Sequence, residues 1–197
     1  MMIHSTNLHE ILQALDRQIG VQGGHPLGLV VCGGSALAAL GFLNRTTKDV
    51  DVLGTAEQKA GKILVQRIRE FPPWLADAAQ KVARDFELPE EWLNLGPAGQ
   101  LESGLPEAFE RRLTVKKYGE YLTVYFTSRF DQIHFKLYAA VDRDDYHVQD
   151  LFGLDPTDTE LERAAQWVLT QDVSEAFRTS LKEFLAQSGR TDVAEGI

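Results

Sequence analysis

The sequence has a single cysteine, Cys32, and few positive charges. One cysteine excludes an internal disulfide and any metal site built from several thiolates, so a reducing cytoplasm is the expected setting. Its 20 Lys and Arg residues against 29 Asp and Glu residues give a formal net charge of −9. A general nucleic-acid-binding surface is normally basic, so any nucleic-acid substrate would have to be held locally.

A segment that could direct export or cross a membrane is also missing. The first twenty residues include Glu10, Asp16 and Arg17, which interrupt the apolar core that a signal peptide requires. Residues 26–44 are uncharged, but they contain glycines and are shorter than the roughly 20 apolar residues that span a bilayer. We therefore expect a cytoplasmic chain that is neither exported nor inserted into a membrane.

Length and composition favour a chain that folds. With 197 residues, of which 44% are hydrophobic, it can bury one sizeable core, or one domain with a small helical appendage. We expect residues 1–152 to form the main domain. Residues 153–197 are expected to form a C-terminal helical extension packed on the same core.

Apolar periodicity predicts alternating helices and strands in the first part of the chain. The apolar positions from Leu8 to Ile19 follow a helical repeat, and Leu27–Cys32 is an unbroken apolar run typical of a buried strand. Pro72 and Pro73 are expected to end the last helix of this part. The predicted order is a helix from residue 8 with Asn7 as its N-cap, a strand at 27–32, a helix at 35–42, a strand at 49–53 and a helix at 57–70.

The later part of the chain adds a hairpin and further helices. Residues 113–117 and 121–126 flank a short loop with Gly119, which predicts an antiparallel hairpin. Helices are expected after Ser128, after the capping box that begins at Thr157, and after Ser174, followed by a frayed polar tail beyond residue 188. Together these elements predict an α/β (α+β) fold in which helices flank a mixed β-sheet.

The most informative pattern is a glycine turn followed by a pair of aspartates. The first apolar strand ends at Gly33-Gly34-Ser35, and such a turn lets the backbone approach an anion and aims the next amides at it. Asp49 and Asp51 occupy alternate positions of a predicted strand, so their carboxylates share one face. Paired carboxylates suit Mg²⁺ or Mn²⁺, and Mg²⁺ usually keeps phosphate oxygens among its ligands. The pattern therefore predicts that a phosphate and a divalent cation are held together.

This ordered pattern resembles the nucleotidyltransferase superfamily, which has the DNA polymerase beta-like fold, and in its spacing it is most similar to AbiEii-type proteins. The resemblance covers residues 28–152 and keeps the order of the family's motifs. The residues that carry it are Gly33, Gly34, Ser35, Ala36, Leu37, Gly41, Arg45, Thr47, Asp49, Val50, Asp51, Lys136, Leu137, Ala139, Arg143, Asp150 and Leu151.

The resemblance implies a mixed sheet with a site for a nucleoside triphosphate and Mg²⁺ or Mn²⁺. Asp49 and Asp51 would hold one or two ions, and Lys136 would lie near the phosphates. An acceptor hydroxyl would attack the α-phosphate, with the ions stabilising the attacking and leaving oxygens. The residues expected to bind the nucleotide are Gly33, Gly34, Ser35, Arg45, Thr47 and Arg143.

Two features depart from the family pattern. The superfamily usually has a third carboxylate on a later strand, and residues 122–126 contain none. Glu120 and Asp131 would replace it only with unusual geometry. AbiEii-type proteins often have a lysine before the glycines, where this chain has Cys32, which is most simply a buried small hydrophobe.

Simpler interpretations stand beside each of these predictions. The glycines can form a mere tight turn, an Asp-x-Asp can be a solvated strand end, and Lys136 can be a solvated residue on a helix flank. Residues 88–111 are irregular and rich in Gly and Pro, which is typical either of a binding loop or lid, or of a surface loop pinned by its aromatic residues. Trp92 in this segment is the tryptophan that could stack on a nucleobase, although core packing is the commoner role.

Three hypotheses of function follow. The leading one is a Mg²⁺-dependent nucleotidyltransferase that modifies an RNA or protein hydroxyl, as a toxin with an antitoxin partner or in phage defence. The alternative is a degenerate relative that binds a nucleotide or a partner protein without turnover. The third takes residues 49–55 as the nucleophile motif of haloacid-dehalogenase-like phosphatases, whose acids must end an apolar strand, whereas residues 44–48 are polar.

Overall fold

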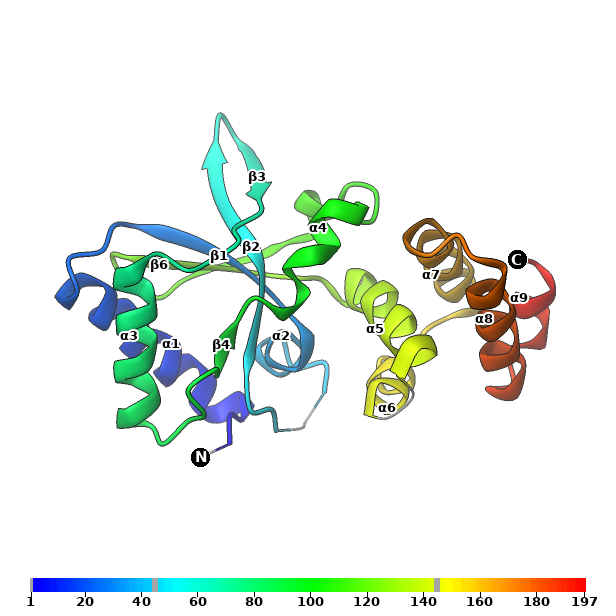
Figure 1. The fold of residues 1–197 in the computed structure, drawn as a ribbon, viewed down its shortest axis with the longest axis horizontal. Helices are drawn as coiled ribbons and strands as arrows, with labels where there is room; N and C mark the ends of the chain where they lie inside the picture. The colour runs from blue at the N-terminus through cyan, green and yellow to red at the C-terminus, as the bar shows by residue number, and fades with distance from the viewer. Residues whose placement is uncertain (1, 44–45, 144–145) are drawn as a thin grey trace. The chain divides into compact units, whose positions relative to one another are not determined.

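In the computed structural model, which describes residues 2–43, 46–143 and 146–197, the strands pair into one mixed sheet (Figure 1). They are β1 (Leu27–Cys32), β2 (Val50–Lys59), β3 (Lys62–Gln66), β4 (Leu93–Asn94), β5 (Thr114–Lys117) and β6 (Leu122–Phe126). Their order is β3-β2-β1-β6-β5, with β4 paired to β2. The β1–β6 and β2–β4 pairs are parallel and the other pairs are antiparallel. The predicted mixed α/β fold is confirmed.

The chain divides into two compact units, Met1–Ser128 and Arg129–Ile197. The first contains the sheet with α1 (Ser5–Val21), α2 (Gly33–Ala39), α3 (Pro73–Asp85), η1 (Gly96–Gly99), α4 (Gln100–Ser103) and η2 (Phe109–Arg112). The second contains α5 (Arg129–Arg143), α6 (Tyr146–Gly153), α7 (Asp158–Gln171), α8 (Glu175–Gln187) and α9 (Thr191–Glu195). The domain division expected at residue 152 stays a prediction, because a compact segment need not be one that folds alone.

Helices α1 and α3 cover one face of the sheet (Figure 1). The predicted apolar stripe of α1 is confirmed, since its members are completely buried. Burying each such aliphatic side chain contributes about 1.5–3 kcal/mol, so this face anchors β1 and β2 firmly. The core residues shared by these elements include Leu8, Ile11, Leu15 and Ile19 of α1, Leu75 and Val82 of α3, and Leu29, Val31, Val52 and Val124 of the sheet.

The helix predicted at residues 57–70 is wrong, because the segment is a β-hairpin. Strand β2 continues to Lys59, and β3 returns antiparallel to it. The two residues between the strands, Ala60 and Gly61, both have positive φ angles, 50° and 76°. Positive φ at both positions is the signature of the two-residue turn that matches the twist of paired strands. The β-branched residues Ile63 and Val65 favour a strand as well.

Helices also lie where none was predicted, among them α3 and α9. Pro72 and Pro73 do not end a helix but begin one, since Pro73 is the first residue of α3, where its missing N–H is not needed. The tail predicted to fray after residue 188 contains α9, in which Val193 and Ala194 are buried.

The other predicted elements of the later chain are confirmed. Strands β5 and β6 form the expected hairpin. The capping box at Thr157 is present, and the side chain of Ser174 accepts a hydrogen bond from the backbone N–H of Phe177 at the start of α8.

Candidate functional site

Gly33 marks the point where β1 ends and α2 begins. Its φ angle is 68°, which favours glycine because an L side chain is strained there. A Cβ atom at this position would also overlap Oδ2 of Asp51. The β1–β2 register pairs Asp51 with Cys32, the neighbour of Gly33. The structure therefore brings the glycine turn and one aspartate of the predicted pair into direct contact.

Asp49 lies just before β2 and is oriented by Thr47. The Thr47 hydroxyl donates to Oδ1 of Asp49 at 2.8 Å. Thr47 is itself buried, and its backbone exchanges two hydrogen bonds with Ile3, of 2.8 and 2.9 Å. The Thr47 hydroxyl thus contacts the aspartate, and the predicted contact of Thr47 with the nucleotide stays a prediction. Because Asp49 is only half-buried, its carboxylate remains accessible to a ligand.

The Gly- and Pro-rich segment reaches this site through β4, which sequence reasoning missed. The register of β2 with β4 places Asn94 beside Asp51, and the Asn94 Oδ1 atom accepts a hydrogen bond from the Gly96 N–H at 2.8 Å. A two-residue strand has no periodicity that a sequence could reveal. Trp92, just before it, is completely buried and donates from Nε1 to the Ala79 carbonyl at 2.9 Å. Its ring is therefore part of the core and does not offer a stacking face.

Gly34, Ser35 and Cys32 are all buried at the turn. The Ser35 hydroxyl donates to the carbonyl of Cys32 at 3.3 Å, so it points back to the end of β1. Cys32 has the buried position expected of a small hydrophobe. Direct contact of Ser35 with a phosphate would require its hydroxyl to rotate away from this carbonyl.

Lys136 lies on α5, in the second unit, and is not the solvated residue of the simpler interpretation. It is only 5% exposed, and its Nζ atom lies 2.7 Å from Oδ2 of Asp150, on α6, which is 2% exposed. Nδ1 of His147 lies 3.5 Å from the same Nζ, and the ring centroid of Tyr146 lies 5.6 Å from it. A buried ammonium needs such a partner, because an unpaired charge is costly away from water. Asp150 thus joins Lys136 as a candidate.

Asp49 and Asp51 are the carboxylates predicted to hold a metal. Within the described residues, no three His, Cys, Asp or Glu side chains gather as a metal site. Glu120 precedes Leu122, which pairs with Leu27 at the far end of β1 from the glycine turn. Leu27 and Cys32 are five residues apart on β1, which corresponds to about 16 Å. Glu120 therefore lies too far away to act as a third carboxylate beside Asp49 and Asp51. Two hard oxygen ligands still fit Mg²⁺, which takes its other ligands from phosphates and water.

These observations agree with a comparison against family models. The model described as nucleotidyltransferase of unknown function (DUF6036) matches residues 7–165. The chain belongs to the DUF6036 family. This membership supports the predicted superfamily and a nucleotide substrate, while the closer likeness to AbiEii-type proteins stays a prediction. Comparison with curated proteins found no match, and comparison with solved structures found none either.

Several predicted residues of this DUF6036 protein are not placed together by the structure. Arg45 lies outside the described residues, and so does the side chain of Arg143, the last residue of α5. Asp131, the other substitute for a third carboxylate, is completely buried on α5. In the described part of the chain, no helix has the length and apolar character needed to span a bilayer.

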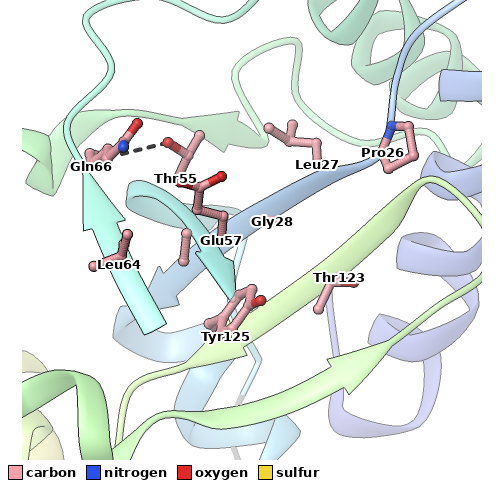
Figure 2. A pocket seen from close by; sticks show the side chains of 10 residues that line it. Pro26, Leu27, Gly28, Thr55, Glu57, Leu64, Gln66, Thr123 and Tyr125 are labelled. Carbon is pink, nitrogen blue, oxygen red and sulfur yellow. Dashed lines mark hydrogen bonds between the residues drawn. The ribbon is translucent and has the colours of Figure 1, made fainter. Parts of the chain in front are cut away.

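A pocket of about 320 Å³ lies elsewhere on the sheet of this DUF6036 protein (Figure 2). Burial raises the pKa of Tyr125, one of the residues that line it. Among the described residues, none of those predicted for the site contributes to its wall. Its lining consists of Pro26, Leu27, Gly28, Thr55, Ala56, Glu57, Leu64, Gln66, Thr123 and Tyr125.

Proposed function

We propose that this DUF6036 protein transfers a nucleoside monophosphate from a nucleoside triphosphate to an acceptor hydroxyl, in a reaction that depends on Mg²⁺ or Mn²⁺. The observation that carries the proposal is the contact between Gly33 and the Asp51 carboxylate, beside an Asp49 that Thr47 orients. Family membership supports the reaction class, and the two aspartates offer a place where a divalent ion and the triphosphate would bind.

The two aspartates would hold the ion against the triphosphate. The ion they would hold would supply positive charge to the phosphate and to the attacking and leaving oxygens. Asp49 and Asp51 supply fixed negative ligands, and Thr47 holds Asp49 in one orientation. Gly33, which has no side chain, leaves the Asp51 carboxylate room at the turn where the phosphates would bind.

Lys136 would supply positive charge to the departing pyrophosphate. Its pairing with Asp150 means that the ammonium is already held in one direction and partly neutralised. We infer that Asp150 positions Lys136, in the way that a carboxylate behind a catalytic cation fixes its geometry. Arg45 and Arg143 keep their proposed roles in nucleotide binding.

The acceptor and the biological role are proposed from the resemblance to AbiEii-type proteins. An RNA or a protein hydroxyl is the proposed acceptor, and the proposed role is that of a toxin held in check by an antitoxin. Growth arrest on expression of the wild-type chain, relieved by Asp49→Asn, is the expected result. Arrest that Asp49→Asn leaves unchanged would separate toxicity from nucleotide transfer.

The experiment that tests the activity is transfer of label from each α-labelled nucleoside triphosphate to total RNA and protein extract. Asp49→Asn and Asp51→Asn remove the charges with little change of shape. Each should lower transfer by about 100-fold or more, because loss of a metal ligand should cost at least as much activity as loss of a group that only supports it. Asp85→Asn is the matched control, since Asp85 is an exposed acid at the end of α3, paired with Lys81. Equal loss in all three variants would contradict the proposal.

A second candidate is a protein that binds the nucleotide without transferring it. It is favoured by one observation, that within the described residues no third acid joins Asp49 and Asp51. This candidate predicts thermal stabilisation by nucleotide and Mg²⁺ with no release of pyrophosphate. Release of pyrophosphate that Asp51→Asn abolishes would exclude it.

A further inference from the structure

The two edges of the sheet are protected differently. Strand β5 forms one edge, and two of its four residues, Lys116 and Lys117, are exposed lysines. Lysines on an edge strand discourage pairing with another strand. Strand β3 forms the other edge, and three consecutive apolar residues, Ile63–Val65, occupy its centre. Leu64 at the middle is 40% exposed. The β3 edge has one exposed lysine, Lys62 at its end, and none at its centre, so it is less protected than the β5 edge.

The hairpin geometry shows which backbone groups of β3 point outward. The residues that flank a two-residue turn, Lys59 and Lys62, form a hydrogen-bonded pair, and such pairs alternate along the ladder. The N–H and C=O groups of Leu64 therefore point to β2 as well. Those of Ile63 and Val65 point away from the sheet, where they form a short template for another strand.

Lys62, Leu64 and Gln66 of β3 are exposed, and Arg67, just after the strand, forms an ion pair with Glu102 of α4. Figure 1 shows β2 and β3 as an arm that extends beyond the neighbouring strands of the sheet. The short turn η2 lies near β3. Even so, among the described residues the backbone bonds of Lys62–Gln66 go to β2 and none goes to η2.

We propose that β3 pairs antiparallel with β3 of a second copy of this chain, so that the two sheets become continuous. The sequence of β3 is complementary to itself in one register, centred on Leu64 of both copies. In that register Ile63 faces Val65 of the other copy. The outward-pointing N–H and C=O groups of these two residues form hydrogen bonds with each other. Lys62 faces Gln66, so no lysine meets a lysine, as it would in a parallel pairing.

The proposal is independent of the nucleotidyltransferase function, and it predicts a weak dimer. One pair of five-residue strands buries less than the roughly 1,200 Å² of a stable interface, so the dimer should dissociate in the micromolar range. Leu64→Lys places two like charges at the symmetry axis and should raise the dissociation constant about tenfold or more in sedimentation equilibrium. Val115→Lys is the matched control, because Val115 is 47% exposed on the other edge, and it should leave association unchanged.

Cross-linking tests the register itself. Residues opposite each other at a non-hydrogen-bonded pair have Cα atoms about 4.5 Å apart, a distance that a disulfide can bridge. Leu64→Cys should therefore form a covalent dimer on mild oxidation. Lys62→Cys should not, because the two Lys62 positions lie about 13 Å apart in this register. A chain that stays monomeric at all concentrations, or equal cross-linking of the two variants, would overturn the proposal.

Discussion

The carboxylate of Asp51 lies against the Cα atom of Gly33, where β1 passes into α2. Pairing of Cys32 with Asp51 across β1 and β2 brings the two residues together, and the missing side chain of Gly33 leaves room for the acid. A phosphate that binds at the turn would thus lie next to Asp51, the proposed metal ligand. The two motifs form one site because the strands that carry them are neighbours.

Gly33→Ala should abolish nucleotide transfer. The new Cβ would displace the Asp51 carboxylate, and the backbone φ of 68° would add about 1–2 kcal/mol of strain. Gly41→Ala is the matched control, because Gly41 has a φ of 71° but no atom within 4 Å of the added Cβ. It should show a similar loss of stability with transfer retained. Rates of transfer and urea unfolding of both variants check this, and equal activities would contradict it.

Thr47→Val should weaken metal-dependent transfer without removing a metal ligand. The substitution keeps the shape but removes the 2.8 Å hydrogen bond to Asp49, which costs about 1 kcal/mol of stability. Asp49 then samples other orientations, so the Mg²⁺ concentration for half-maximal rate should rise by about 10-fold. Thr47→Ser keeps the hydroxyl and should restore the wild-type Mg²⁺ response. A Val variant with an unchanged response would show that Thr47 only supports the fold.

The glycine turn and the acid pair could be predicted because their signals are local. An unbroken apolar run ending in two glycines specifies a buried strand and a turn, whatever surrounds it. Alternation placed Asp51 in a strand, although the structure begins that strand only after Asp49. The phosphatase hypothesis requires both acids at the end of an apolar strand. Asp49 instead lies just before β2, and Asp51 lies near the beginning of that strand.

The rest of the site depends on contacts that no local pattern encodes. Asn94 meets Asp51 only because the two-residue strand β4 pairs with β2. Asp150 faces Lys136 because α5 packs on α6, and residues so far apart show no shared periodicity. The β2–β3 hairpin was mistaken for a helix because three consecutive apolar residues fit either structure. Its turn has Ala60 at the position where asparagine is usual, so the sequence lacks the common signal of a hairpin.

Acid should destabilise the protein partly through His9. Burial, and then the charge of Lys116, hold the pKa of His9 below its ordinary value of 6.5. The unfolded chain therefore binds a proton more readily, so this stability is present above about pH 6.5 and is lost as the pH falls below it. His9→Gln should flatten the decline in melting temperature between about pH 7.5 and 5. Lys116→Gln should raise the His9 pKa in an NMR titration, and a pKa unchanged by it would contradict this account.

Replacing the Lys136–Asp150 pair should separate its structural role from its proposed catalytic role. Lys136→Met removes the ammonium that pairs with the buried Asp150 and should cost about 3–5 kcal/mol in urea unfolding, since the two side chains are only 6% and 3% exposed. The double variant Lys136→Met, Asp150→Leu should recover most of that stability, because apolar side chains can replace a buried ion pair. Asp158→Asn, which breaks the exposed pair with Arg190, should cost at most about 1 kcal/mol. A double variant that is stable but inactive would show that the Lys136 charge acts on the nucleotide, whereas full activity would make the pair purely structural.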